Sequence, residues 1–143
     1  MVNEFGEIAL RTNGPGLTDV TARVEAFLSG ASMQRGLLTL HVRHTSASLL
    51  IQENADPDVQ RDLLGFFERI APTLRDPSMD WISHRTEGAD DMPAHIRAAL
   101  TATTLSIPVE DGRMALGTWQ GIYLFEHRER PHDRRIACHA MGS

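Results

Sequence analysis

The chain has 143 residues, of which 41% are hydrophobic and 23% charged, and its 14 basic and 19 acidic residues give a formal net charge of -5. This composition is typical of one globular domain with its own core and argues against disorder. An acidic chain lacks the basic surface of most nucleic-acid-binding proteins, so we do not expect a nucleic-acid partner.

Cysteine usage and hydropathy exclude further classes of protein and site. The single cysteine, Cys138, excludes both an intrachain disulfide and a metal site of the CxxC type. The opening stretch MVNEFGEIALRTNGPG has no apolar signal core, and no run approaches the roughly 18 to 20 apolar residues of a membrane span. We therefore expect one domain over residues 1–143, located in the cytoplasm and without a membrane partner.

The N-terminal third predicts strands around one helix. Residues 5–11 predict a first strand, which the turn-forming TNGPG ends. Apolar residues at helical spacing predict a helix over 17–30, with Thr18 as its cap and Gly30 as its stop. Alternating apolar residues then predict a strand within 36–54, long and bent.

The middle of the chain predicts a helix and a long loop. The stretch DPDVQRDLLGFFERIAP places Pro57 in the first helical turn, acids early and apolar residues along one stripe. Residues 72–90 contain two prolines, a glycine and few apolar side chains, which indicates a loop. Loops of this length are often functional or disordered.

The next stretch, EGADDMPAHIRAAL, resembles a helix start with a surplus acid. Asp90 and Asp91 can cap the helix and complement its dipole, and Pro93 fits the first turn. We expect the buried side to consist of Met92, Ile96, Ala99 and Leu100, with His95 at its edge. One acid explains capping, so the stretch is either a doubly acidic cap beside a satisfied histidine or part of a site.

The C-terminal part predicts strands only. TTLSIPV and RMALGTWQGIYLFEHR are joined through EDG, a strong hairpin signal, and RRIACHAM predicts a last strand. Strands with inserted helices and no regular βαβ alternation indicate an α+β domain, mainly an antiparallel, β-sandwich-like sheet with two or three helices.

Polar residues interrupt the predicted strand at HTSAS. If the strand continues past Val42, then His44, Ser46 and Ser48 extend its buried face and need hydrogen-bond partners. Alternatively, the strand ends at Arg43 and these residues bond to a turn. The sequence leaves both interpretations open.

Two groups of side chains are candidates for binding. A strand-end His44, a loop His84 and a helix-start His95 are a scattered trio of the kind that builds a three-nitrogen zinc site with one open position. Thr118 and Gln120, with Arg128 further along, could hold an anion such as a phosphate. The spacing of the histidines matches no motif.

Four runs together resemble one family over nearly the whole chain: HTSASLLIQENADPDVQRDL, HRTEGADDMPAHIRAAL, IPVEDGRMALGTWQGIYLFEHR and the closing basic strand. It is the YjbQ family, often labelled secondary thiamine-phosphate synthase. The resemblance implies a compact α+β domain, usually a homotrimer. This chain departs from the family pattern at Ser46, Trp81 and Phe125, where relatives often have Thr, Tyr and Cys.

The resemblance implies an enzyme that joins hydroxymethylpyrimidine diphosphate to a thiazole phosphate and releases pyrophosphate. A divalent metal, zinc or magnesium, would be held by His44, His84 and His95, and catalysis would involve His44, His95, Asp91 and Glu53, the last as a reserve general base. Phosphate oxygens would be held by Ser46, Thr118, Gln120 and Arg128. Two alternatives are a metal-dependent hydrolase of a small phosphorylated metabolite and a metabolite-binding trimer without turnover.

Overall fold

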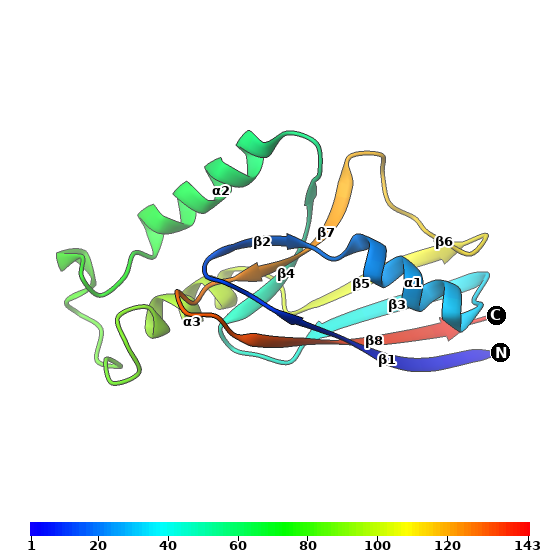
Figure 1. Ribbon diagram of the computed structural model, residues 1–143, viewed down its shortest axis with the longest axis horizontal. Coiled ribbons are helices and arrows are strands. Elements are labelled where there is room, and N and C mark those ends of the chain that lie inside the picture. The colour runs from blue at the N-terminus through cyan, green and yellow to red at the C-terminus, as the bar shows by residue number, and fades with distance from the viewer.

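The computed structural model describes all residues from Met1 to Ser143 and folds them into two antiparallel sheets with three α-helices (Figure 1). The elements in chain order are β1 (Val2–Arg11), β2 (Gly16–Asp19), α1 (Thr21–Ala31), β3 (Arg35–Val42), β4 (Ala47–Glu53), α2 (Pro57–Ile70), a short 3-10 helix (Pro77–Met79), α3 (Asp91–Leu100), β5 (Thr104–Glu110), β6 (Arg113–Met114), β7 (Gln120–Glu126) and β8 (Asp133–Gly142).

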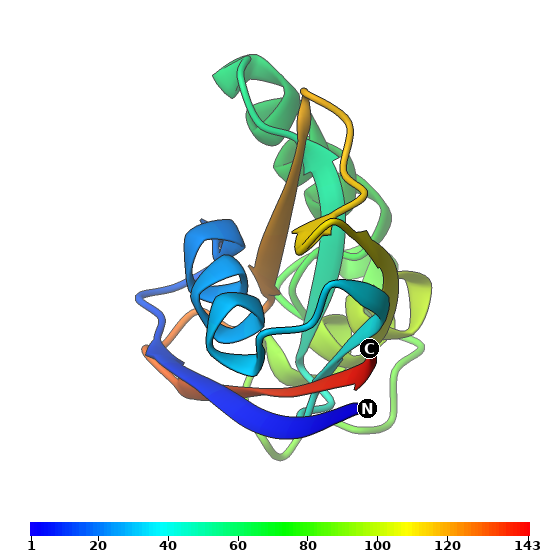
Figure 2. The same cartoon turned by 90° about the vertical axis from the view of Figure 1, so that its right-hand side faces the viewer.

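The two sheets have the strand orders β1-β8-β3-β5-β6 and β2-β7-β4, and every pairing is antiparallel. The sheets lie in different planes, with α1 beside them (Figure 2). This arrangement confirms the predicted α+β class with an antiparallel, sandwich-like sheet. None of the helices combines the length and the hydropathy of a membrane-spanning segment.

The hydrophobic core lies between the sheets and under α1. Leu38, Leu40 and Val42 of β3 are buried, which confirms the alternation predicted for this strand. Ile122 and Leu124 of β7 join the same cluster from the other sheet. Apolar packing of Ile122 and Leu124 therefore fixes the position of β7. It thereby also positions the polar residues at and beyond the end of this strand, from Glu126 to Arg128.

Helix α1 begins and ends later than predicted. Thr18 lies in β2, opposite Leu124, and is not a cap; the helix begins at Thr21, whose N–H donates to Asp19 Oδ1 at 2.9 Å. Gly30 lies inside the helix and does not stop it. The stop is Ser32, whose left-handed φ of 55° lets its own N–H bond to the carbonyl oxygen of Ser29.

Two predicted long strands are each divided between the sheets. The segment 36–54 forms β3 in one sheet and β4 in the other, so the interpretation that the strand ends near Arg43 holds. The segment 113–128 likewise forms β6 and β7 in different sheets. Between β5 and β6, Asp111 and Gly112 have positive φ of 52° and 73°, which confirms the predicted hairpin turn.

Helix α2 stands away from the sheets at one end of the molecule (Figure 1). It starts as predicted, with Pro57 in the first turn and with Asp56 accepting a hydrogen bond from the N–H of Asp58 at 2.9 Å. Only Phe67 is fully buried, packing edge to face on Phe125 of β7 at a centroid distance of 5.2 Å. The outer face of β7 is thus covered as well as its inner face.

The buried side of α3 was predicted wrongly: the helix is rotated about its axis, so that a different face packs against the domain. Its buried residues include Pro93, Ala94, Arg97 and Ala98, whereas Ala99 and Leu100 are exposed. Small residues let the helix approach the β4 side closely. Arg97 turns inward because its guanidinium finds the carbonyl oxygen of Ala71.

The segment 72–90 is a loop, as predicted, apart from the short 3-10 helix. Met79 and Ile82 are buried and anchor it to the domain. Arg85 holds the same segment by donating hydrogen bonds to the carbonyl oxygens of Met79 and Ile82, at 3.2 and 3.1 Å. The loop that carries His84 is therefore fixed by packing and by hydrogen bonds.

Candidate metal centre

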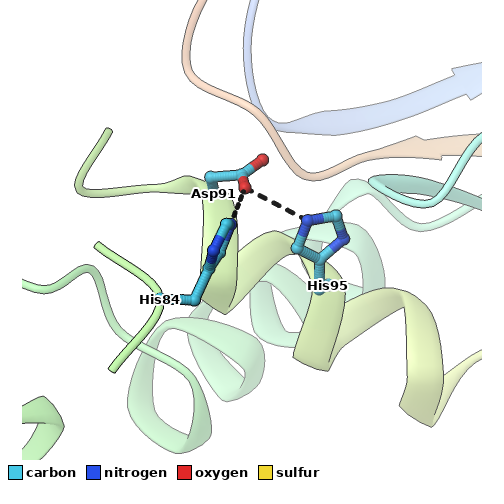
Figure 3. A group of neighbouring side chains, drawn as sticks. All are labelled: His84, Asp91 and His95. Atoms are coloured by element: carbon cyan, nitrogen blue, oxygen red, sulfur yellow. Dashed lines mark hydrogen bonds and ion pairs between the residues drawn. The ribbon is translucent and has the colours of Figure 1, made fainter. Parts of the chain in front are cut away.

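Three side chains meet at the start of α3 (Figure 3). Oδ2 of Asp91 lies 2.9 Å from Nε2 of His84 and 3.1 Å from Nε2 of His95. One ligand atom from each residue lies within 4.8 Å of the others. The Asp91 side chain is 7% exposed, while those of His84 and His95 are 44% and 32% exposed. The group is thus open to solvent on the histidine side.

Local structure explains this convergence. Asp91 and His95 are four residues apart on α3, so their side chains lie on the same helix face. His84 arrives from the anchored loop and approaches the same carboxylate oxygen from the other side (Figure 3). The surplus acid of the sequence, Asp91, is therefore the centre of the group.

The position of one proton follows from the surroundings of His95. Its Nδ1 lies 2.9 Å from the backbone carbonyl oxygen of Thr45, which can only accept a hydrogen bond, so Nδ1 carries a proton. In the neutral ring, Nε2 then has a lone pair, and this lone pair faces a carboxylate oxygen. Two acceptors at this distance repel unless a proton or a metal ion lies between them.

The donor set fits a divalent metal. Two imidazole nitrogens and one carboxylate oxygen with an open side are the protein ligands of many catalytic zinc sites. Bonds of about 2.0 to 2.1 Å in a tetrahedral site place ligand atoms about 3.3 Å apart. The observed separations of 2.9 and 3.1 Å differ from this by a few tenths of an ångström. All three ligand atoms lie within 4.8 Å of one another, so the two nitrogen–oxygen separations suit an ion and the two imidazoles are near enough to share it.

Arg128 is engaged by both acids of the α3 start. Its Nε donates to Asp90 Oδ2 at 2.9 Å and its Nη1 to Asp91 Oδ1 at 2.7 Å. Nη2 reaches the carbonyl oxygen of Glu87 at 3.2 Å. The predicted role of Arg128 in holding phosphate is not supported, because Arg128 is held by carboxylates that would themselves repel a phosphate. Arg128 lies behind the group of His84, Asp91 and His95, where it orients Asp91.

The same contacts set the ionisation of the acids. Burial by itself would raise the pKa of Asp91, but the hydrogen bond with His84 and the charge of Arg128 outweigh it and lower the pKa. The pKa of Asp90 is also lowered, because hydrogen bonds from Arg128 and from the N–H of Glu129 outweigh burial. Asp90 makes no side-chain cap to α3. Both acids are therefore carboxylates near neutral pH.

His44 is not part of this group. Its Nε2 accepts a hydrogen bond from the backbone N–H of Arg135 at 2.8 Å, so that nitrogen is already used. Burial and the charge of Arg134 lower its pKa. The group that could hold a metal ion thus contains His84 and His95 of the predicted trio, with Asp91 in the third position.

Ser46 belongs to a buried ion pair that the sequence did not reveal. Arg134 donates to both oxygens of Glu126 and, at 3.0 Å, to Oγ of Ser46. Glu126 also accepts from the hydroxyl of Thr12. The hydroxyl of Ser46 therefore completes the surroundings of this pair, which lies at the end of β7 where the core face turns polar. One signal in the sequence could have located Glu126: it follows Ile122 and Leu124 at alternate positions of β7 and therefore lies on the same buried face.

The remaining predicted site residues lie at the other end of β4 and β7. Glu53 pairs with Gln120, whereas Ala47 pairs with Glu126, and the strand between them is about 20 Å long. Oε2 of Glu53 accepts from the N–H groups of Ala55 and Asp56 at 2.8 and 2.7 Å, which makes it a turn residue. Glu53 is therefore too distant to act as a base at the metal group.

Thr118 and Gln120 line a separate pocket of about 540 Å³ between α1 and the β6–β7 connection. Oε1 of Gln120 accepts from the N–H of Gly117 at 2.8 Å. The predicted anion site of Thr118, Gln120 and Arg128 is therefore divided, because Gln120 and Arg128 flank opposite ends of β7.

Comparison with known proteins places the chain in a family. A family model described as UPF0047 protein YjbQ-like matches residues 6–143. UPF0047 protein sll1880 of Synechocystis is 49% identical over 135 residues, which cover 94% of this chain and 89% of that protein. UPF0047 protein YjbQ of Escherichia coli O157:H7 is 47% identical over 107 residues, or 75% of this chain and 74% of that protein.

Solved structures with a similar fold include members of the same family. A YjbQ/UPF0047 family protein from Clostridium acetobutylicum has a TM-score of 0.84 at 34% identity, covering 95% of this chain and 99% of that one. A protein from Aeropyrum pernix has a TM-score of 0.87 at 28% identity, covering 98% and 99%. The quoted sequence runs and the fold lead to the same conclusion: the chain belongs to the UPF0047 family of YjbQ-like proteins.

Proposed function

We propose that this protein is a metal-dependent enzyme that acts on a small phosphorylated metabolite, with zinc bound by His84, Asp91 and His95. One observation carries the proposal. The Thr45 carbonyl oxygen fixes the proton of His95 on Nδ1, so Nε2 presents a lone pair toward the carboxylate oxygen that His84 also contacts. A cation at this point relieves the repulsion and satisfies all three ligand atoms.

The specific reaction that we propose is the one implied by the sequence runs shared with the YjbQ family. The ring nitrogen of a thiazole phosphate forms a bond to the methylene carbon of hydroxymethylpyrimidine diphosphate, and the carbon–oxygen bond to the diphosphate breaks. The electron pair of that bond leaves with pyrophosphate. A divalent metal supplies a Lewis acid for the charge of the leaving group.

The roles of the side chains follow from their contacts. His84 and His95 bind as neutral imidazoles, and Asp91 contributes one oxygen while Arg128 holds its other oxygen at 2.7 Å. Arg128 is engaged by Asp90 and Asp91, so its guanidinium is not free to neutralise a leaving diphosphate, and a metal held by His84, Asp91 and His95 would supply that positive charge. We therefore expect an absolute metal requirement for turnover.

A hydrolase of a small phosphorylated metabolite is the second candidate. It is favoured by the 44% exposure of the His84 side chain, which gives water access to the group. A homotrimer forms part of the proposal for either reaction. Uncovered apolar residues support such an assembly: Phe66 and Ile70 on α2 are 53% and 45% exposed, and Trp119 is 64% exposed.

Metal binding is tested first. The purified protein is stripped with a chelator, titrated with zinc by calorimetry, and analysed for its metal content as isolated. We expect one zinc ion per chain, and a loss of affinity of at least about 100-fold in Asp91→Ala and in His95→Ala. His41→Ala is the matched control, because His41 is an exposed histidine that contacts Thr104 and not the group. Unchanged zinc affinity in both site variants contradicts the proposal.

Turnover separates the candidate functions. The protein is incubated with hydroxymethylpyrimidine diphosphate, with and without thiazole phosphate, and pyrophosphate and phosphate are measured. Release of pyrophosphate that needs both substrates and zinc supports the transferase. Phosphate release without the thiazole supports the hydrolase. Zinc binding without any turnover leaves a binding protein and contradicts the proposed enzyme.

A further inference from the structure

The pocket of about 540 Å³ between α1 and the β6–β7 connection has no part in the proposed function. Gln120 in its wall begins β7, whereas Arg128, which orients Asp91, follows the other end of that strand. The pocket and the metal group thus lie at opposite ends of the molecule, as the positions of α1 and α3 show (Figure 1). Its volume is within the roughly 300–1,000 Å³ of small-molecule sites.

Hydrogen bonds hold the walls of the pocket in place. The N–H of Gly112, in the β5–β6 turn, donates to the carbonyl oxygen of Gln34 at 3.0 Å. The N–H of Gly117 donates to Oε1 of Gln120 at 2.8 Å and closes the turn that leads into β7. The pocket is therefore formed before any ligand arrives, which reduces the entropy that binding costs.

The apolar surface of the pocket consists of three side chains, Leu28, Met114 and Leu116. Leu28 is 3% exposed and belongs to the hydrophobic core. Met114 and Leu116 are half-buried and pack against the same core. The pocket thus offers a fixed apolar surface, which favours a ligand with an apolar part because contact removes apolar area from water.

Two opposite charges line the same pocket. Glu25 lies three residues before Leu28 on α1, so both side chains are on one helix face, and Arg113 lies in β6. No ion pair within 4.0 Å joins Glu25 and Arg113 to each other or to another residue. Glu110, the acid beside Arg113 in the hairpin, is paired with Arg35 at 3.1 Å. The pocket therefore presents one carboxylate and one guanidinium from different elements.

We propose that this pocket binds a free amino acid with a large apolar side chain. The ammonium group pairs with Glu25, the carboxylate pairs with Arg113, and the side chain packs on Leu28, Met114 and Leu116. A zwitterion suits both charges at once, whereas a simple anion meets the Glu25 carboxylate and a simple cation meets the Arg113 guanidinium. The inference does not rest on the proposed function, because it uses none of the residues of the metal group.

L-Phenylalanine is the probe, titrated by calorimetry into the full chain with chelator present, so that metal binding plays no part. Three related compounds each lack one feature: N-acetylphenylalanine lacks the ammonium, phenylalanine amide lacks the carboxylate, and glycine lacks the apolar side chain. We expect each of the three to bind at least about tenfold more weakly than phenylalanine. Any one of them that binds as tightly as phenylalanine overturns the proposal, and so does the absence of saturable phenylalanine binding.

Variants assign the two charges. Glu25→Gln should bind phenylalanine and its N-acetyl derivative with a ratio of about one, while it still prefers phenylalanine to the amide by about tenfold. Arg113→Gln should show the reverse pattern. Both side chains are exposed, so we expect both variants to fold like the wild type.

Arg23→Gln is the matched control. Arg23 also lies on α1, but its guanidinium donates to the carbonyl oxygen of Ala9 at 2.8 Å and does not line the pocket. This variant should keep both wild-type ratios. If the ratios of Glu25→Gln and Arg113→Gln also equal those of the wild type, phenylalanine binds elsewhere and the proposed site is wrong.

Discussion

The Nδ1–H of His95 donates a hydrogen bond to the backbone carbonyl oxygen of Thr45 across 2.9 Å, joining α3 to the connection between β3 and β4. This one bond fixes which nitrogen of His95 can bind a metal. Because Thr45 contributes a backbone atom, no substitution of its side chain removes the contact directly. The orientation of the His95 ring is therefore built into the fold.

The first prediction concerns stability in the presence of zinc. Zinc at about 100 times its dissociation constant should stabilise the stripped protein by ~2.7 kcal/mol, which corresponds to a rise in melting temperature of roughly 5–10 °C. His95→Ala should melt at the same temperature with and without zinc, while His41→Ala should respond like the wild type. Differential scanning calorimetry measures all three. An equal zinc response in His95→Ala means that the ion binds elsewhere.

The second prediction is a pH dependence that arises at His127. Burial lowers its pKa to about 3 in the folded chain, against roughly 6.5 when unfolded, so below pH 6.5 the unfolded chain binds the extra proton. The contribution is fully present above pH 6.5 and is lost progressively as the pH falls toward 3. At pH 5 the loss is ~2 kcal/mol relative to pH 7.

Urea denaturation at pH 7 and at pH 5 measures this loss. His127→Phe cannot take up the proton, so its free energy of unfolding should fall by ~2 kcal/mol less than that of the wild type over the same interval. Other groups titrate equally in both proteins and cancel in the difference. Parallel pH profiles for the two proteins place the acid sensitivity at another residue.

The third prediction concerns the buried pair of Glu126 and Arg134, whose side chains are 1% and 4% exposed. Glu126→Gln leaves a buried guanidinium without its anion and should cost about 3–5 kcal/mol of stability. The control is Glu110→Gln, which breaks the pair with Arg35, where both side chains are more than 60% exposed. That change should cost about 0–1 kcal/mol. Similar costs for the two variants argue that the buried pair adds nothing specific.

The fourth prediction uses Gly30, which lies in the last turn of α1. A Cβ at this position meets nothing within 4 Å, and the residue is helical, so Gly30→Ala should stabilise the protein by roughly 0.5–1 kcal/mol. Gly36→Ala is the contrasting variant. Its φ is +154° and a Cβ there would collide with the backbone of Met141 and Gly142, so it should be destabilising. Destabilisation by Gly30→Ala in thermal melts contradicts the assignment of Gly30 to the helix interior.

The sequence by itself determined the class of fold and the composition of its elements. Alternation at Leu38, Leu40 and Val42 located a buried strand, and Pro57 located a helix start, because period and local backbone geometry act over a few residues. The surplus acid beside Asp90 and the nearby His95 left open whether the start of α3 is only a cap, and the structure brings Asp91 and His95 together with His84.

Only the tertiary structure decided which residues meet. Strand alternation cannot show where a chain passes from one sheet to another, so His44 was expected beside His95 although its Nε2 is used by Arg135. Arg128 was predicted to hold phosphate because the sequence did not reveal its carboxylate partners. These partners, Asp90 and Asp91, come from a segment about 40 residues earlier in the chain. Arg97 lies on the buried side of α3, which had been predicted to consist of Met92, Ile96, Ala99 and Leu100. Contacts between distant segments carry no local period, and the functional groups of this protein are made of such contacts.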